Sequence, residues 1–152
     1  MRLQLDLLQH QNQLRVRTES GQRYVRGHIR RHDLVLTPEE WVRQLLLQHL
    51  VGTMTYPVGK IAVERGLRVH QLHKRCDILV FDPNFQPWML IECKAPRVEL
   101  SAATFHQIAI YNLPLRVPYL MVSNGRESYV CAMHYATEEW KFLDQLPPYP
   151  TR

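Results

Sequence analysis

Hydrophobic and polar positions along the 152-residue chain follow two periods, one typical of strands and one typical of helices. Alternation on both sides of a glycine-containing turn, in LRVR-TESGQ-RYVR, predicts a hairpin over residues 14–26. Short apolar runs bounded by turn residues predict further strands at residues 58–67, 74–82, 88–96, 118–125 and 127–134.

Two segments instead have the hydrophobic spacing of helices. Residues 38–51 repeat apolar side chains every three or four positions, with Thr37 as the N-cap, Pro38 at the first helical position and Glu40 completing a capping box. Residues 102–112 follow a capping serine and end before a proline, which predicts a second helix. The tail EEWKFLDQLPPYP has room for one helical turn before its prolines.

The order of these elements, β-β-α-β-β-β-α-β-β, predicts an α/β fold with a mixed central β-sheet flanked by helices. No repeat, low-complexity segment or linker interrupts the chain. We therefore expect residues 1–152 to form a single domain, in which residues 1–33 are a basic N-terminal hairpin extension.

The composition is that of a soluble globular protein, with 45% apolar and 22% charged residues. No apolar run approaches the roughly 20 residues of a membrane span, and MRLQLDLLQHQ has no features of a secretory signal. The three cysteines are widely spaced, which argues against disulfides and predicts a cytoplasmic location. The H-x2-H-x2-C spacing of His70, His73 and Cys76 suggests zinc, but the sequence offers no fourth ligand.

The net charge of +5 is unevenly distributed along the chain. Residues 1–75 contain 13 Lys/Arg against 6 Asp/Glu, whereas residues 76–152 contain 6 against 8. Arginine side chains bind phosphate groups through their forked guanidinium, so nucleic acid is a candidate partner. For any single arginine, ordinary solvated strand surface is the alternative.

An acid and a base occupy the predicted strand LIECKAP, at residues 90–96. Glu92 and Lys94 are two residues apart, so both side chains point to one face of the strand, with Cys93 on the other. A charge within an apolar run is costly unless it is paired or bound to a metal. A salt-bridged pair on an edge strand is the simple alternative to a functional site.

The turn DPNFQP brings a second acid into the same region. If Phe81 pairs with Trp88, the register of the hairpin sets Asp77 opposite Glu92. Two carboxylates this close repel each other unless one is protonated or a cation lies between them. A hard divalent ion such as Mg²⁺ meets that requirement.

These residues resemble the D…(D/E)-x-K signature of the PD-(D/E)XK nuclease superfamily. Asp77 is followed, after fourteen intervening residues, by Glu92-Cys93-Lys94. More particularly, LTPEEWVRQ…KRCDILVFD…LIECKAP…FHQIAIYN…SNG is similar to the N-terminal domain of type I restriction enzyme R subunits, over roughly residues 34–126. The resemblance implies a restriction-endonuclease-like core. The R subunits carry motor domains after this module, whereas this sequence ends at Arg152, so we expect no DNA translocation from it alone.

The resemblance also implies a role for each residue of the signature. Asp77 and Glu92 would bind Mg²⁺ or Mn²⁺, together with the carbonyl oxygen of Cys93. The ion would activate a water molecule for attack on phosphate. Lys94 would orient the attacking hydroxide or offset charge in the transition state.

Two polar residues of the second predicted helix fit the same resemblance. Gln107 and Tyr111 are four residues apart and therefore lie on one side of the helix. They are similar to the QxxxY extension of the RecB-like branch, which implies that they position the site. A solvated stripe is the alternative.

The family also tends to use a glutamate from its first helix. Glu39 and Glu40 are the candidates, and we carry Glu40 as a catalytic residue although a capping role would also explain it. Glu64, on the neighbouring strand, is a further candidate with an equal case for being a surface residue.

Three functions follow from this sequence. The first is a Mg²⁺-dependent deoxyribonuclease that hydrolyses phosphodiester bonds of DNA. The second is a nucleic-acid-binding module of the same fold that does not cut, and the third is an interaction domain of a restriction or repair assembly. Partners would be DNA, restriction or repair proteins, or a second copy in a homodimer. The sequence does not show whether DNA or RNA is cut, whether ends or internal bonds are attacked, or whether there is a sequence preference.

Overall fold

A computed structural model describes residues 2–69 and 72–151, and of the strand residues 65, 67–69 and 72–75 it describes the backbone alone. The N-terminal part contains a short 3-10 helix, η1 (Leu8–Gln13), and an antiparallel three-stranded sheet. The strands of this sheet are β1 (Val16–Glu19), β2 (Gln22–Arg26) and β3 (Asp33–Val35). The predicted hairpin is therefore present, and β3 adds a third strand to it.

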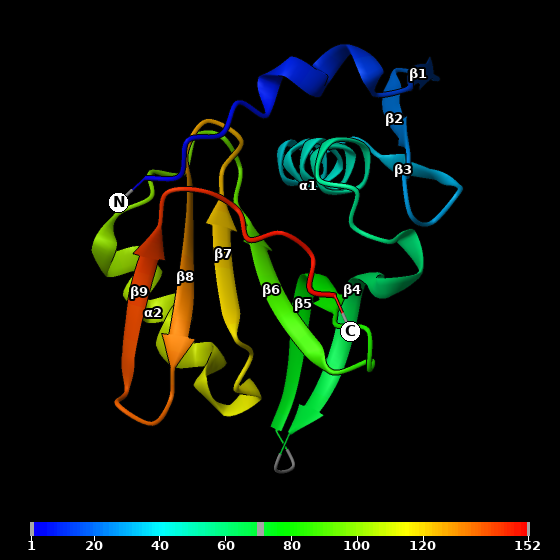
Figure 1. Ribbon diagram of the computed structural model, residues 1–152. Coiled ribbons are helices and arrows are strands. Elements are labelled where there is room, and N and C mark those ends of the chain that lie inside the picture. The colour runs from blue at the N-terminus through cyan, green and yellow to red at the C-terminus, as the bar shows by residue number, and fades with distance from the viewer. Residues whose placement is uncertain (1, 70–71, 152) are drawn as a thin grey trace.

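The second sheet has six strands in the order β4-β5-β6-β7-β8-β9 (Figure 1). All neighbours are antiparallel except β6 and β7, which are parallel and are joined through α2 (Ala102–Asn112). The strands are β4 (Ile61–Val69), β5 (Leu72–Phe81), β6 (Pro87–Cys93), β7 (Tyr119–Ser123), β8 (Ser128–His134) and β9 (Glu139–Leu143). The predicted α/β class with a mixed central sheet is confirmed.

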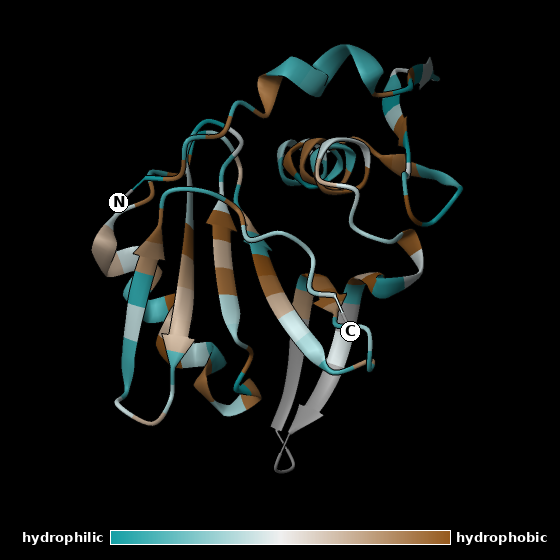
Figure 2. Ribbon diagram, in the orientation of Figure 1, coloured by the Kyte–Doolittle hydropathy of each residue, from teal (hydrophilic) through white to brown (hydrophobic). Residues whose placement is uncertain are grey.

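The two helices pack on opposite faces of this sheet, and α2 lies behind it in the view of Figure 1. Buried leucines of α1 (Pro38–Gln48) pack against one set of strand residues, which includes Ile78, Val80, Met89, Ile91 and Met121. On the other face, α2 contributes to a core that includes Leu79, Leu90, Phe105, Ala109 and Leu120. Hydrophobic residues concentrate on the central strands β6 and β7, whereas η1 is largely hydrophilic (Figure 2).

The start of α1 follows the predicted cap only in part. Thr37 Oγ1 accepts a hydrogen bond of 3.0 Å from the Glu40 N–H, as an N-cap does. The Glu40 side chain does not return this bond, because the Thr37 N–H donates to the Val35 carbonyl at 3.1 Å. The α-helix ends at Gln48 and continues as a π-helical turn, His49–Thr53, instead of running to residue 51.

Two local predictions are wrong. The tail forms strand β9, paired with β8, and not a helical turn. Phe81 pairs with Pro87 and not with Trp88, because the register shifts between Val80 and Phe81. His70 of the suggested zinc pattern lies outside the described residues. In the described ranges, no helix is long and apolar enough to cross a membrane.

Candidate active site

The inner register of the β5–β6 ladder sets two acids opposite each other. Ile78 pairs with Ile91 and Leu79 with Leu90, so the next residues outward are Asp77 and Glu92. The irregularity at Phe81 lies at the other end of the ladder and leaves this part unchanged. The predicted opposition of the two carboxylates therefore holds, although the pair from which it was counted does not form.

Asp77 joins β6 to α1 through its two carboxylate oxygens. Its Oδ2 accepts a hydrogen bond of 2.8 Å from the backbone N–H of Cys93. Its Oδ1 accepts one of 3.1 Å from Nη2 of Arg43. The bond to the backbone fixes this carboxylate at the end of the strand pair, next to the Glu92-Cys93-Lys94 segment.

Glu92 is partly buried and interacts directly with its neighbour across the strands. Burial, together with the charge and hydrogen bonding of Asp77, raises its pKa to about 8, although Lys94 and Arg43 oppose the shift. All four side chains are therefore close enough to act on one another. Two neighbouring acids, one of which has a raised pKa, are a pair whose repulsion a bound cation would relieve.

Arg43 is the central residue that the sequence analysis missed. It is 7% exposed, and its Nη1 lies 2.6 Å from Glu40 Oε1 and 3.5 Å from Glu64 Oε1. Burial lowers its pKa, but the nearby carboxylates, Glu40 first, raise it more, so the guanidinium is firmly charged. A signal was present in the sequence, because Arg43 and Gln44 follow Glu40 by three and four residues and so lie on one side of the helix with it.

Of the two first-helix glutamates, Glu40 belongs to this cluster and Glu39 does not. Glu40 is 7% exposed, and its Oε2 accepts a hydrogen bond of 2.9 Å from Gln44 Nε2. Glu39 is exposed. The capping role that made Glu40 ambiguous is carried by its backbone N–H alone, so its side chain is free for the cluster.

Glu64 lies beside the same acids on the neighbouring strand. Val63 pairs with Ile78 and Arg65 with Cys76, which sets Glu64 next to Asp77. Its carboxylate lies 3.4 Å from Arg30 Nη1 as well as near Arg43, so it is not an ordinary surface residue. Its φ of 49° is a left-handed conformation that a side chain of this kind rarely adopts, and such strain concentrates at functional sites.

Gln107 and Tyr111 lie on the solvent side of α2, where Tyr111 is 55% exposed. The helix packs on the sheet face to which Leu90 points, and alternation along β6 sends Glu92 to that face too. The positioning role of both residues stays a prediction. The predicted strand over residues 88–96 ends earlier, because β6 stops at Cys93 and Lys94 is the first residue after it. Lys94 is partly buried, and its backbone N–H donates to the Ser123 carbonyl at 2.8 Å.

Within the described residues, no three His, Cys, Asp or Glu side chains are grouped so that they could hold a metal ion. Four carboxylates instead surround or adjoin one buried guanidinium. The arrangement is a charge cluster built from α1, β4, β5 and β6, with Lys94 at its edge.

The family described as type I restriction enzyme R protein N terminus matches residues 38–147. This chain belongs to that family. The match covers both helices and every strand of the six-stranded sheet, and so includes Glu40, Asp77, Glu92 and Lys94. No curated protein matches the chain.

Among solved structures, the chain is similar to a fragment of a protein described as an HsdR subunit of a type I restriction enzyme from Vibrio vulnificus YJ016. The identity is 18% and the TM-score is 0.51. The likeness covers 74% of this chain and 24% of that one, so this chain spans about a quarter of its structural relative. At this identity the likeness shows the fold, which agrees with a restriction-endonuclease-like core.

Proposed function

We propose that this chain is a Mg²⁺-dependent nuclease of the PD-(D/E)XK type that hydrolyses phosphodiester bonds of DNA. The observation that supports it best is the opposition of Asp77 and Glu92, with Lys94 two residues further along the chain, directly after β6. Membership of the R protein N-terminal family supports a setting in DNA restriction. DNA and the other parts of a restriction enzyme would then be its partners.

The donor chemistry fits a hard divalent cation. Asp77 and Glu92 supply carboxylate oxygens, the ligands that Mg²⁺ and Mn²⁺ prefer, and the Cys93 carbonyl is the expected third donor. The raised pKa of Glu92 reflects burial beside another acid, which a cation would relieve. When bound, such an ion lowers the pKa of a water molecule and stabilises charge on the phosphate.

The remaining side chains would orient the reactants. Lys94 would hold the attacking water by a hydrogen bond and offset the negative charge that develops on the phosphate. Glu40 acts through Arg43. Arg43 Nη1 donates a hydrogen bond of 2.6 Å to Glu40, and its Nη2 donates one of 3.1 Å to Asp77, so Glu40 helps to hold Arg43 against Asp77. Glu40 is therefore a positioning residue in this arrangement.

A second function is favoured by one specific observation. The Arg43 guanidinium already supplies positive charge to Glu40, Glu64 and Asp77, and a charge cluster of this kind is stable without a metal. A module that binds nucleic acid or a partner subunit without cutting would use the cluster as a structural element only.

A cleavage assay separates the two functions. Labelled single- and double-stranded DNA, with RNA in parallel, is incubated with the protein and Mg²⁺ or Mn²⁺. We expect metal-dependent cleavage that Lys94→Met reduces by about 10²–10³-fold and that Asp77→Asn abolishes. The matched control is Lys141→Met, an exposed lysine on β9. Binding of DNA without cleavage, under both metals and by all variants, would instead support the second function.

A further inference from the structure

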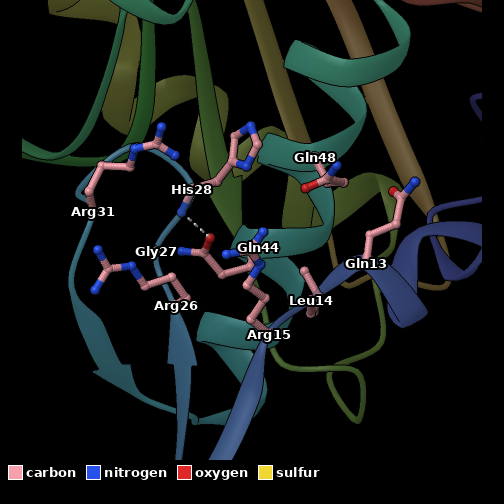
Figure 3. A pocket seen from close by; sticks show the side chains of 9 residues that line it. All are labelled: Gln13, Leu14, Arg15, Arg26, Gly27, His28, Arg31, Gln44 and Gln48. Atoms are coloured by element: carbon pink, nitrogen blue, oxygen red, sulfur yellow. Dashed lines mark hydrogen bonds between the residues drawn. The ribbon is translucent and has the colours of Figure 1, made fainter.

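A polar cavity of about 470 Å³ lies beside the charge cluster, between the N-terminal sheet and α1 (Figure 3). Its volume falls within the range of small-ligand sites. Apart from Leu14 and Gly27, its wall is made of basic and amide side chains, among them Arg15, Arg26, Arg31, His28, Gln44 and Gln48.

The charge of this cavity is unbalanced. Three arginines line it and no acid does. Arg26 Nη1 lies 3.9 Å from the Oδ1 of Asp33, which is outside the cavity wall. The pKa of His28 is lowered by burial and by the positive charge of Arg31. Because the wall itself contains three arginines and no acid, it carries excess positive charge, which favours an anion as the ligand.

The chemistry of the wall suits a phosphate group. Guanidinium groups bind phosphate oxygens in pairs, and amide N–H groups add neutral donors around them. The arginines are exposed, so an extended polyanion can reach them from solvent.

One buried side chain separates the cavity from the acids. Gln44, which is 2% exposed, accepts a hydrogen bond of 2.9 Å from the His28 N–H and donates one of 2.9 Å to Glu40. An anion held in the cavity therefore lies one side chain away from the Glu40–Arg43–Asp77 cluster.

We infer that this cavity binds a phosphate group of a nucleic acid strand and fixes its backbone beside the carboxylates. The inference rests on the proposed function only in taking nucleic acid as the ligand. It does not require that the strand be cut.

The test measures the binding of a fluorescent duplex DNA by anisotropy, in EDTA so that no cleavage occurs. Arg15→Gln and Arg31→Gln each remove one charge from the cavity. The matched control is Arg23→Gln, an exposed arginine of β2 that does not line the cavity. Thermal unfolding of each variant checks that it is folded.

We expect each cavity variant to weaken binding about tenfold and to reduce the slope of log K against log salt by about 1, as for the loss of one phosphate contact. Arg23→Gln should change affinity by less than about twofold. A duplex with 5′-phosphate ends is compared with one with 5′-hydroxyl ends, so that a terminal phosphate is distinguished from an internal one. Either source supports the inference.

The inference would be overturned if all three variants lost affinity equally or if none of them lost affinity. It would also be overturned if the wild-type protein did not bind DNA. Binding that depends on the cavity in a protein that cuts no substrate would end the nuclease proposal and leave this inference standing. If Arg15→Gln and Arg31→Gln leave cleavage of DNA unchanged, the nuclease proposal stands and this inference is overturned.

Discussion

At the scale of single residues, the buried charge of Arg43 decides how the acids of the site can coexist. It contacts Glu40, Glu64 and Asp77, which come from three different elements. Its Nε has no hydrogen-bond partner among the described residues, so the guanidinium is held mainly by the charges at its other end. Without it, several carboxylates would face one another in a partly buried space.

Arg43→Met should therefore destabilise the protein strongly. Removing one partner of a buried ion pair costs about 3–5 kcal/mol, because the remaining charges are left uncompensated. The free energy of unfolding in EDTA measures this loss, and Mg²⁺ should recover part of it in the variant. Arg2→Met, which removes an arginine paired with Glu127 at the surface, should cost less than about 1 kcal/mol. Equal costs for the two variants would contradict the central place of Arg43.

Single residues also show why the site was only partly predictable. The D…ExK pattern could be read because strand alternation and a hairpin register are local rules, and both held for Asp77 and Glu92. Arg43 could not be ranked above other arginines, because its three partners are brought together by tertiary packing. The capping box misled for a related reason, since Glu40 turns to Arg43 and Gln44 instead of back to Thr37.

At the scale of elements, a pair of buried histidines fastens η1 to the end of α1. His10 Nε2 and His49 Nδ1 lie 3.0 Å apart, and Gln13 bonds the other nitrogen of His10. Burial, together with the charge of His10, lowers the pKa of His49 to about 4. The folded protein therefore prefers a neutral His49.

This preference predicts a loss of stability in acid. The folded-state pKa lies below the unfolded value of 6.5, so the contribution is present above about pH 6.5 and is lost as pH falls toward 4. The loss amounts to as much as about 3 kcal/mol. Urea unfolding across this pH range, compared between wild type and His49→Gln, measures it. Parallel curves for the two proteins would show that His49 does not titrate in this way.

The turn between β7 and β8 also holds α1 in place. Gly125 has a φ of 89°, and a Cβ on it would lie 3.2 Å from Val42 Cγ2. Gly125→Ala should therefore lower the free energy of unfolding by about 1–2 kcal/mol. Gly59→Ala is the control, because a Cβ there meets nothing within 4 Å and no positive φ applies. A Gly125→Ala protein as stable as Gly59→Ala would contradict the tight packing of this turn.

Elements whose ends are marked by local sequence signals were predicted well. Elements that depend on pairing with a distant strand were not. Both helices begin at their predicted caps, since Thr37 and Ser101 carry that signal themselves. The tail has room for one helical turn before its prolines, yet Trp140 and Phe142 alternate as in a strand and pack near α2. Pairing with β8 makes the tail a strand instead of a helix, and the sequence of the tail alone does not reveal this partner.

At the scale of the whole molecule, the two sheets meet α1 from different sides and place two features next to each other. The six-stranded sheet supplies Asp77 and Glu92, with Lys94 directly after β6. The N-terminal sheet and the segments next to its strands supply the arginines of the cavity. The uneven charge along the sequence thus becomes a basic region beside an acidic one. A strand of nucleic acid bound by the basic region would lie near the acidic region.

The most direct test of the account is calorimetric titration of Mn²⁺ and Mg²⁺ into the metal-free protein. We expect one ion to bind per chain, with at least about tenfold weaker binding in Asp77→Asn and in Glu92→Gln, since each removes one of the two carboxylate ligands. Glu99→Gln, which changes an exposed acid seven residues from Glu92, should bind as the wild type does. If the wild-type protein binds no ion, or if all three variants bind equally, the paired carboxylates are not a metal site and the charge cluster is structural.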